Sequence, residues 1–159
     1  MPISKMDEAI RFARADDHLR ALNLFLEIYG NELTGMRTPK DASGLSYFGL
    51  ALALVRKQIK PAIDMCRRAI ELEFYNPDHY ANLARVYHAG GNRKKAVEAA
   101  EQGLKLHPEN DYLISVRQSL GVRAVPAVPF LDRANPINVT LGQARHAKKL
   151  AEEEGKKKR

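Results

Sequence analysis

Apolar and polar residues follow a helical period from the start of the chain. Between residues 3 and 30, apolar side chains recur three or four positions apart in two groups, which predicts two helices with one apolar face each. The groups are Met6, Ala9, Ile10 and Ala13, followed by Ala21, Leu22, Phe25 and Ile28. Between them, Asp16 or Asp17 can cap the second helix by accepting a hydrogen bond from a free backbone N–H group. The pattern predicts a helix pair joined by a tight turn.

The same period returns from about Ser43. The preceding residues, 31–41, contain Gly35, Thr38 and Pro39 and have no apolar face, which indicates a loop. Two further helix pairs are then predicted. Their apolar faces are Leu45, Phe48, Leu52 and Val55 with Ala62, Ile63, Cys66, Ala69 and Ile70, and then Tyr80, Leu83, Ala84 and Tyr87 with Ala96, Val97, Ala100, Gly103, Leu104 and Leu106.

The second and third pairs are related by a shift of 34 residues. Six positions match in size and polarity: Ala62 with Ala96, Ile63 with Val97, Cys66 with Ala100, Ala69 with Gly103, Ile70 with Leu104 and Leu72 with Leu106. A fixed period of this length indicates stacked repeats, and roughly three such pairs plus a capping helix are needed to bury their apolar stripes. We therefore expect an all-α solenoid domain over residues 1–122. It comprises repeats over residues 2–30, 42–76 and 77–110 and a capping helix over residues 110–121.

Specific residues of the third pair support this architecture. Asn82-Leu83-Ala84, Tyr87, Gly91-Asn92, Ala96, Leu104 and Pro108 stand at the positions that are typical of the tetratricopeptide repeat (TPR) family, which the chain resembles over about residues 2–110. The second pair keeps Phe48-Gly49, Ala62 and Ala69 but has Phe74 where the family has Pro, and the first pair keeps Ala9, Ala21 and Phe25. The resemblance implies antiparallel helix pairs with small residues where helices cross.

The remaining residues differ in character. Residues 123–141 contain Pro126, Pro129 and Pro136, which forbid a continuous helix, so we expect an extended segment that packs its apolar side chains along the array. Residues 142–159 form a basic tail that we expect to be weakly helical or disordered. The tail has seven basic and three acidic side chains, a net +4 of the total +7. The other 141 residues are therefore nearly balanced in charge.

The composition limits the class of protein. With 45% hydrophobic and 28% charged residues, the chain is neither a disordered polyelectrolyte nor a membrane protein. Its longest apolar run, residues 47–55, is about half of the ~18 residues that a membrane span requires. The first residues are charged where a secretory signal would be apolar, and a single cysteine excludes an intramolecular disulfide. We therefore expect a cytoplasmic protein without a membrane span.

No motif for catalysis or metal binding is found. Residues 90–95, GGNRKK, lack the spacing of a phosphate-binding loop and indicate a turn between two helices. The five histidines are scattered, with no two of them three or four residues apart on one helix. Cys66 lies on an apolar stripe and is expected to be a buried structural thiol. We expect no metal, no cofactor and no enzymatic reaction.

The TPR resemblance implies a concave face lined by the first helix of each pair. A peptide or helix of a partner protein is expected to bind in this groove, which would make the protein an adaptor. The candidate contacts are Tyr47, Asp78, Arg85, His88 and Tyr112. A solvated helix face without a ligand is the alternative interpretation of these side chains. Self-association of the chain is a further possibility.

Some TPR domains hold the C-terminal carboxylate of a chaperone with a clamp of Lys, Asn and Arg residues. Asn82 and Arg85 resemble two members of this clamp. The first pair, however, has Met6, Asp7 and Ile10 on the corresponding face, so chaperone tails are not expected as ligands.

The basic tail offers an alternative function. Its cations could neutralise the phosphates of a nucleic acid or of a ribosome, with an affinity that depends on salt and not on sequence. It also lacks the interleaved aromatic residues with which single-strand binders stack bases, and a Lys-rich end can simply favour solubility. The candidate contacts are Arg145, Lys148, Lys149, Lys156, Lys157, Lys158 and Arg159.

Overall fold

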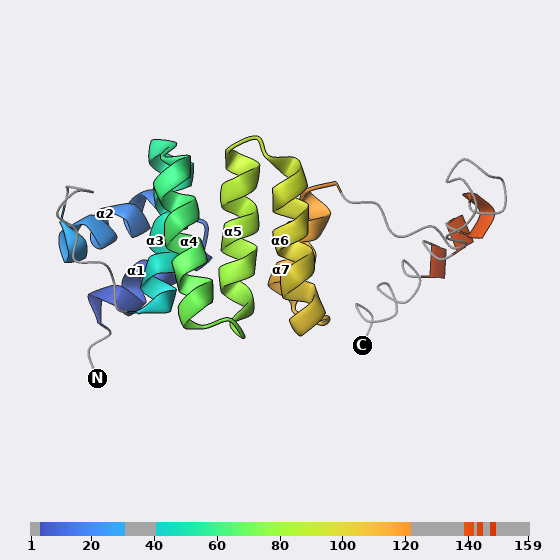
Figure 1. Cartoon of the computed structure of the whole chain (residues 1–159), viewed down its shortest axis with the longest axis horizontal. Coiled ribbons are helices and arrows are strands. Elements are labelled where there is room, and N and C mark those ends of the chain that lie inside the picture. The colour runs from blue at the N-terminus through green and yellow to red at the C-terminus, as the bar shows by residue number, and fades with distance from the viewer. Residues whose placement is uncertain (1–3, 31–40, 122–138, 142, 145–146, 149–159) are drawn as a thin grey trace. The chain divides into compact units, whose positions relative to one another are not determined.

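The computed structural model describes residues 4–30, 41–121, 139–141, 143–144 and 147–148. The chain divides into two units, Met1–Val122 and Arg123–Arg159. Within the described part of the first unit the structure is all-helical, as predicted. Its helices are α1 (Lys5–Arg14), α2 (His18–Tyr29), α3 (Ala42–Arg56), α4 (Ile59–Leu72), α5 (Pro77–Ala89), α6 (Arg93–Leu106) and α7 (Asp111–Ser119). They correspond to the three predicted pairs and the predicted capping helix (Figure 1).

The second unit is described at few positions. Residues 139–141, 143–144 and 147–148 are helical and exposed. The first three of these belong to the segment that was expected to be extended. Residues 31–40 of the predicted loop and the apolar side chains of residues 125–131 lie outside the described residues.

Short polar side chains begin nearly every helix in the first unit. The side chains of Ser4, Asp17, Asp41, Asn76, Asn92 and Asn110 each accept a hydrogen bond from a backbone N–H group in the first turn that follows. Of the two candidates between α1 and α2, Asp17 is the cap, and its carboxylate accepts from the N–H of Arg20 at 3.2 Å. These caps fix where each helix starts and thus set the lengths of the turns.

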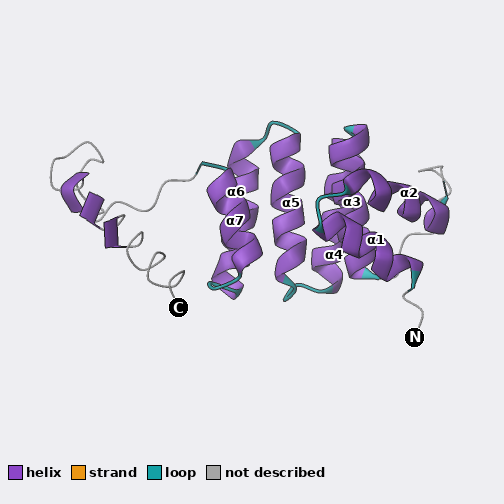
Figure 2. Cartoon of the chain, turned by 180° about the vertical axis from the view of Figure 1, so that it is seen from behind, coloured by secondary structure: helices purple, strands orange, loops and turns teal. Residues whose placement is uncertain are grey.

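The helices from α3 onward form two layers. In Figure 1, α4 and α6 lie in front of α3 and α7, and the opposite view in Figure 2 brings α3 and α7 forward. The second helices of the pairs thus form the outer layer, while α3, α5 and α7 form the inner layer. This is the arrangement that stacked helix pairs require to bury their apolar stripes.

The first pair is arranged differently. Figures 1 and 2 show α1 and α2 running across the direction of α3 to α7. Aromatic packing holds α2 there, because the Phe25 and Tyr29 rings stack on Phe48 of α3 at centroid distances of 5.3 and 5.8 Å. Gly44 permits the close approach, since a Cβ atom at this position would lie 3.0 Å from the Tyr29 hydroxyl and 3.2 Å from Met6. The first pair therefore covers α3.

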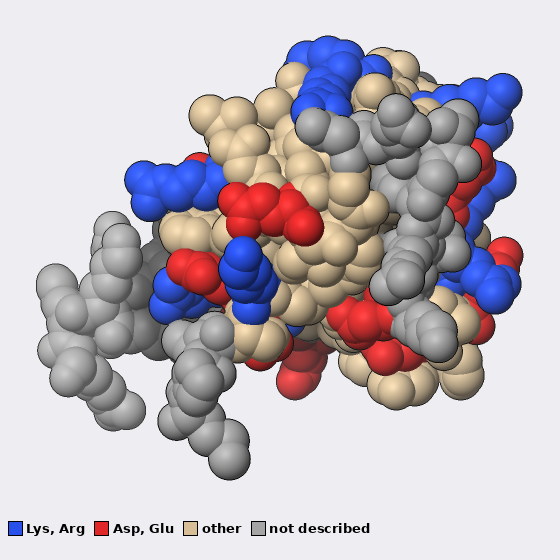
Figure 3. All heavy atoms as spheres, turned by 90° about the vertical axis from the view of Figure 1, so that its left-hand side faces the viewer, with Lys and Arg blue, Asp and Glu red and all other residues tan. Residues whose placement is uncertain are grey.

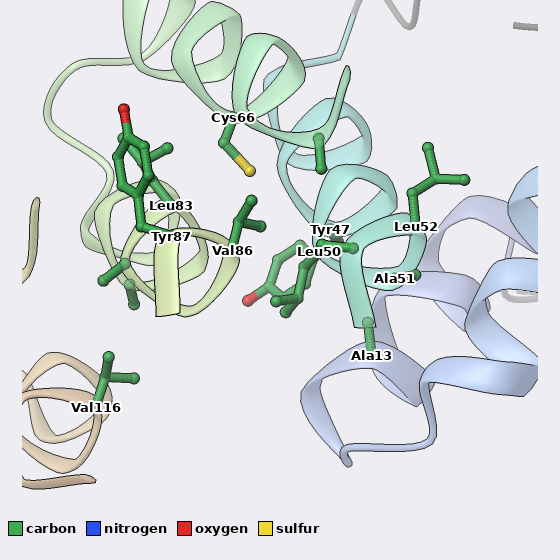
Figure 4. Packing of buried hydrophobic residues seen from close by; sticks show 14 of the residues in the cluster. Ala13, Tyr47, Leu50, Ala51, Leu52, Cys66, Leu83, Val86, Tyr87 and Val116 are labelled. Atoms are coloured by element: carbon green, nitrogen blue, oxygen red, sulfur yellow. The ribbon is translucent and has the colours of Figure 1, made fainter. Parts of the chain in front are cut away.

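The central helix α3 is buried on all sides as a result. Every residue from Gly44 to Ala53 is buried, including the polar Ser46. A helix that is apolar all round is typical of a core position. Cys66 of α4 points into the space beside α3 and α5 (Figure 4). It is fully buried, as predicted, and burial raises the pKa of its thiol to about 12.

Small residues lie at the predicted helix crossings. Gly49, Ala62, Ala69, Ala84, Ala96 and Gly103 are all buried. Gly103 is the tightest case, because a Cβ atom there would lie 2.7 Å from the Tyr80 Cβ and 2.8 Å from a methyl group of Leu113. Both neighbours belong to other helices, so α6 can approach α5 and α7 only with glycine at this position.

We predict that Gly103→Ala lowers the free energy of unfolding by about 1 to 3 kcal/mol, because overpacking outweighs the better helix propensity of alanine. Urea denaturation measures the change. Gln102→Ala, at the neighbouring exposed position, is the control and should leave stability within about 0.5 kcal/mol. Equal stability of Gly103→Ala and the wild type would contradict the packing described.

A buried histidine connects stability to pH. The His79 side chain is 0% exposed, its Nε2 lies 3.4 Å from a carboxylate oxygen of Glu73, and its Nδ1 has no hydrogen-bond partner among the described residues. Burial lowers the pKa of His79 below its ordinary 6.5, although Glu73 acts to raise it. The folded state therefore favours the neutral ring.

We predict that the protein loses stability as the pH falls through the ordinary histidine pKa of 6.5. In that window the unfolded chain binds a proton that the folded state does not, so stability rises with pH there. His79→Gln should reduce this dependence, and urea denaturation at pH values on either side of the window measures it. Identical dependences for His79→Gln and the wild type would exclude His79 as its source.

Candidate functional site at the inner face

The inner face carries a hydrogen-bonded cluster of Arg14, Tyr47 and Asp78 from α1, α3 and α5. The Arg14 guanidinium donates to the Tyr47 hydroxyl at 2.9 Å and to the Asp78 carboxylate at 2.9 Å. The Tyr47 hydroxyl donates in turn to Asp78. Arg14 also lies over the Tyr47 ring, 5.5 Å from its centroid. This cluster ties α1 to α5 across α3.

A second cluster joins the turn between α1 and α2 to α5 and α7. Arg85 of α5 donates to the Asp16 carboxylate at 2.8 Å and to the Tyr112 hydroxyl at 3.1 Å. Its guanidinium also lies 3.2 Å from Nε2 of His18. Tyr112 donates to the side-chain carbonyl of Asn82, so the contacts continue into the core.

Asn82 is buried beneath these residues. Its side-chain amide donates to the Ser46 hydroxyl at 2.9 Å while its carbonyl accepts from Tyr112 at 2.8 Å. Both ends of the amide are therefore engaged within the chain, and the side chain is 0% exposed. Asn82 is consequently not available to hold the carboxylate of a ligand.

The two side chains of the Asp16 and Arg85 ion pair differ in exposure. The Asp16 side chain is 71% exposed and that of Arg85 is 24% exposed. Burial acts to raise the pKa of Asp16, but Arg85 outweighs it and holds that pKa below 3.8. Burial and the Arg85 charge both lower the pKa of His18 below 6.5. Near neutral pH, the Arg85 cation is thus already paired with a carboxylate of its own chain.

The predicted groove residues have different surroundings. Tyr47 is 1% exposed and lies beneath Arg14, so it does not face an open groove. Asp78 and Arg85 are partly buried and paired with Arg14 and Asp16. Tyr112 is partly buried beside Arg85, whereas His88, one turn after Arg85, is exposed. The open part of the inner face is therefore the side of α5 and α7 that extends past Arg85.

Sequence reasoning missed Arg14, Asp16 and His18 as parts of this site. They lie 64 to 69 residues from the side chains that they contact on α5, and each has an ordinary local role at a helix end. No local pattern connects positions so far apart. Of the candidate tail residues, Lys148 is helical and exposed, and the other six lie outside the described residues.

Two further observations restrict the chemistry of the described residues. No three His, Cys, Asp or Glu side chains in that part of the chain gather as metal ligands would. No helix among these residues is long and apolar enough to cross a bilayer.

Solved TPR domains share this helical arrangement. The second TPR domain of human RPAP3, determined in complex with the HSP70 peptide SGPTIEEVD, matches with a TM-score of 0.53 and 18% identity, over 76% of this chain and 94% of that one. The Sgt2 TPR domain from Aspergillus fumigatus matches with a TM-score of 0.53 and 15% identity, over 84% and 94% of the two chains. The chain has the TPR fold. No protein-family model and no curated protein matches the sequence, so the similarity is one of structure.

A third TPR domain, the first of Spaghetti (RPAP3), is bound to the HSP90 peptide SRMEEVD. It matches with a TM-score of 0.53 and 14% identity, over 74% of this chain and 87% of that one. The TPR fold explains the two layers and the small residues at the crossings. The ion pairs between the first pair and α5 are formed by this chain's own residues.

We predict a measurable coupling between Asp16 and Arg85. A double-mutant cycle with Asp16→Asn and Arg85→Gln should give about 0.5 to 1 kcal/mol at low salt, and less as salt screens the exposed carboxylate. Urea denaturation of the four proteins measures it. The more exposed Lys5 and Glu27 pair is the control and should couple more weakly. Zero coupling at low salt would contradict a formed Asp16 and Arg85 pair.

Proposed function

We propose that the protein is a non-enzymatic adaptor that binds a peptide or a helix of another protein at its inner face. The observation that carries the proposal is a row of polar side chains on the inner helices α3, α5 and α7. The row consists of Tyr47, Asp78, Arg85 and Tyr112, and Arg85 connects it to Asp16 in the turn between α1 and α2. A preformed row of this kind lowers the ordering cost of binding an extended segment. The peptide complexes of the similar TPR domains support a protein ligand.

The binding position follows from what remains accessible. The corner formed by α1 and α2 covers the inner face at Tyr47, so the partner lies on α5 and α7, against Arg85, His88 and Tyr112. There it either extends beside this corner or displaces Asp16 from Arg85. Displacement exchanges one carboxylate for another, which an acidic segment of the partner can do with little loss.

We do not propose that this chain binds the chaperone peptides that its structural neighbours bind. Asn82, which resembles a clamp residue, is buried and bonded at both ends of its amide. Arg85, which resembles the other clamp residue, is paired with Asp16. We place the adaptor in the cytoplasm. Its Cys66 is a free, buried thiol, and free thiols are typical of reducing compartments.

Site-specific photocross-linking in a cell extract tests the proposal. A photoreactive residue in place of His88 should form cross-links to another protein, because this exposed position borders Arg85 on the inner face. The cross-links should persist at about 0.5 M salt, at which long-range charge attraction is screened. They should also persist without residues 142–159. The same probe at Glu27, an exposed residue of α2, is the matched control and should give none.

The outcomes separate the two candidate functions. Nucleic-acid cross-links that disappear at high salt, or when residues 142–159 are removed, would favour the basic tail as the contact. No protein cross-links from His88, or equal cross-links from His88 and Glu27, would overturn the inner-face proposal.

A further inference from the structure

A cleft opens on the outer face of the array, away from the proposed peptide site. It lies between α4 and α6, has a volume of about 400 Å³ and includes Ile70, Tyr80 and Leu83 in its lining. The side chains of Leu83 and Tyr87 lie on the same side of α5 (Figure 4). This volume falls in the range of about 300 to 1,000 Å³ that is typical of ligand pockets. An apolar side chain of a ligand can therefore be accommodated against α5.

Two cations meet at one end of this cleft. The Arg67 guanidinium donates to the Tyr87 hydroxyl at 2.8 Å, and the Lys95 ammonium lies 5.8 Å from the centroid of the Tyr87 ring. Arg67 and Lys95 are exposed, and neither has a carboxylate partner among the described residues. Because Tyr87 accepts from Arg67, its own hydroxyl proton remains free to be donated.

The start of α6 adds positive potential at the same place. Its first turn contains Arg93, Lys94 and Lys95 and no acidic residue. Cations are unfavourable at a helix N-terminus, where the helix dipole is positive, so stability of α6 does not explain them. Arg93 has a structural contact, since it donates to the backbone carbonyls of Leu120 and Gly121. The Lys95 ammonium, in contrast, has the Tyr87 ring as its contact within the described part of the chain.

The inner face provides a contrast. There Arg14 is paired with Asp78 and Arg85 with Asp16, so an incoming anion must displace a carboxylate of the chain. At the outer cleft an anion gains the attraction of two cations without this cost. The charge that a ligand must bring to the Tyr87 end of the cleft is therefore negative.

Acidic residues further along the cleft limit the size of that anion. Glu71 and Glu98 also line it, and Glu71 is paired with Arg68. A long polyanion would place further charges beside these carboxylates and be repelled, whereas the few carboxylates of a short segment can lie close to Arg67 and Lys95. Figure 3 shows that the end of the array at α1 and α2 carries charges of both signs.

We propose that the outer cleft is a docking site for a short segment of a partner protein in which an apolar side chain is flanked by carboxylates. The apolar side chain packs against Leu83 and Ile70, and the carboxylates pair with Arg67 and Lys95 and accept from the Tyr87 hydroxyl. This site lies on the opposite face from Arg85, so it adds a second partner surface to the adaptor and does not depend on the first.

NMR titration of the full-length, isotope-labelled protein tests the site. The probes are the acetylated and amidated peptide DELFDE and its uncharged counterpart NQLFNQ. DELFDE should shift the amide signals of Leu83, Tyr87 and Lys95 and bind about ten-fold more tightly than NQLFNQ, which two exposed charge pairs can supply. Arg67→Glu and Lys95→Glu should each weaken DELFDE binding by about ten-fold.

Lys105→Glu is the matched control, because it makes the same change on α6 about 15 Å along the helix from Lys95. It should change the affinity by less than about two-fold. Equal binding of both peptides, unchanged binding by Lys95→Glu, or no shift at millimolar peptide would overturn the proposal. Shifts confined to residues around Arg85 and Tyr112 would overturn it and favour the inner face instead. Tighter binding of oligothymidylate than of DELFDE at the same amides would show a nucleic-acid site.

Discussion

The complete burial of α3 is the constraint on which the rest of the structure depends. An apolar helix of this length needs neighbours on every side, and α4 and α5 cover only part of its surface. The first helix pair supplies the remaining cover by crossing α3, with Phe25 and Tyr29 stacked on Phe48. That crossing brings the corner between α1 and α2 to α5, where Arg14 and Asp16 find Asp78 and Arg85.

This arrangement changes what a TPR fold offers to a partner. Three parallel repeats would leave one continuous inner groove, but here the first pair covers that groove at Tyr47 and forms ion pairs with Asp78 and Arg85 of α5. The accessible surfaces are then the exposed side of α5 and α7 and the outer cleft at Tyr87. On the inner side a ligand competes with carboxylates of the chain, whereas Arg67 and Lys95 at the outer cleft have no carboxylate partner among the residues that the structure describes. The two proposed sites should therefore favour acidic ligands to different degrees.

The sequence predicted the fold well because the information for it is local. Helical periodicity, polar caps and the 34-residue shift located the helix pairs, and small residues such as Gly103 marked the crossings. The direction of the first pair could not be predicted, because it depends on contacts between α2 and α3 across a loop with no pattern of its own. The same limit applies to the site. Arg85 was expected on the inner face from the TPR resemblance, but no local pattern predicts its pairing with Asp16, 69 residues away.

The first pair lies over α3 and reaches α5. Nuclear Overhauser effects in the full-length protein test this most directly, because they report proton pairs that are close in space. The structure predicts effects between the Arg14 side chain and the Tyr47 ring, and between the His18 ring and the Arg85 side chain. The absence of these effects, together with effects that place α1 alongside α3 as a third parallel repeat, would contradict this position of the first pair.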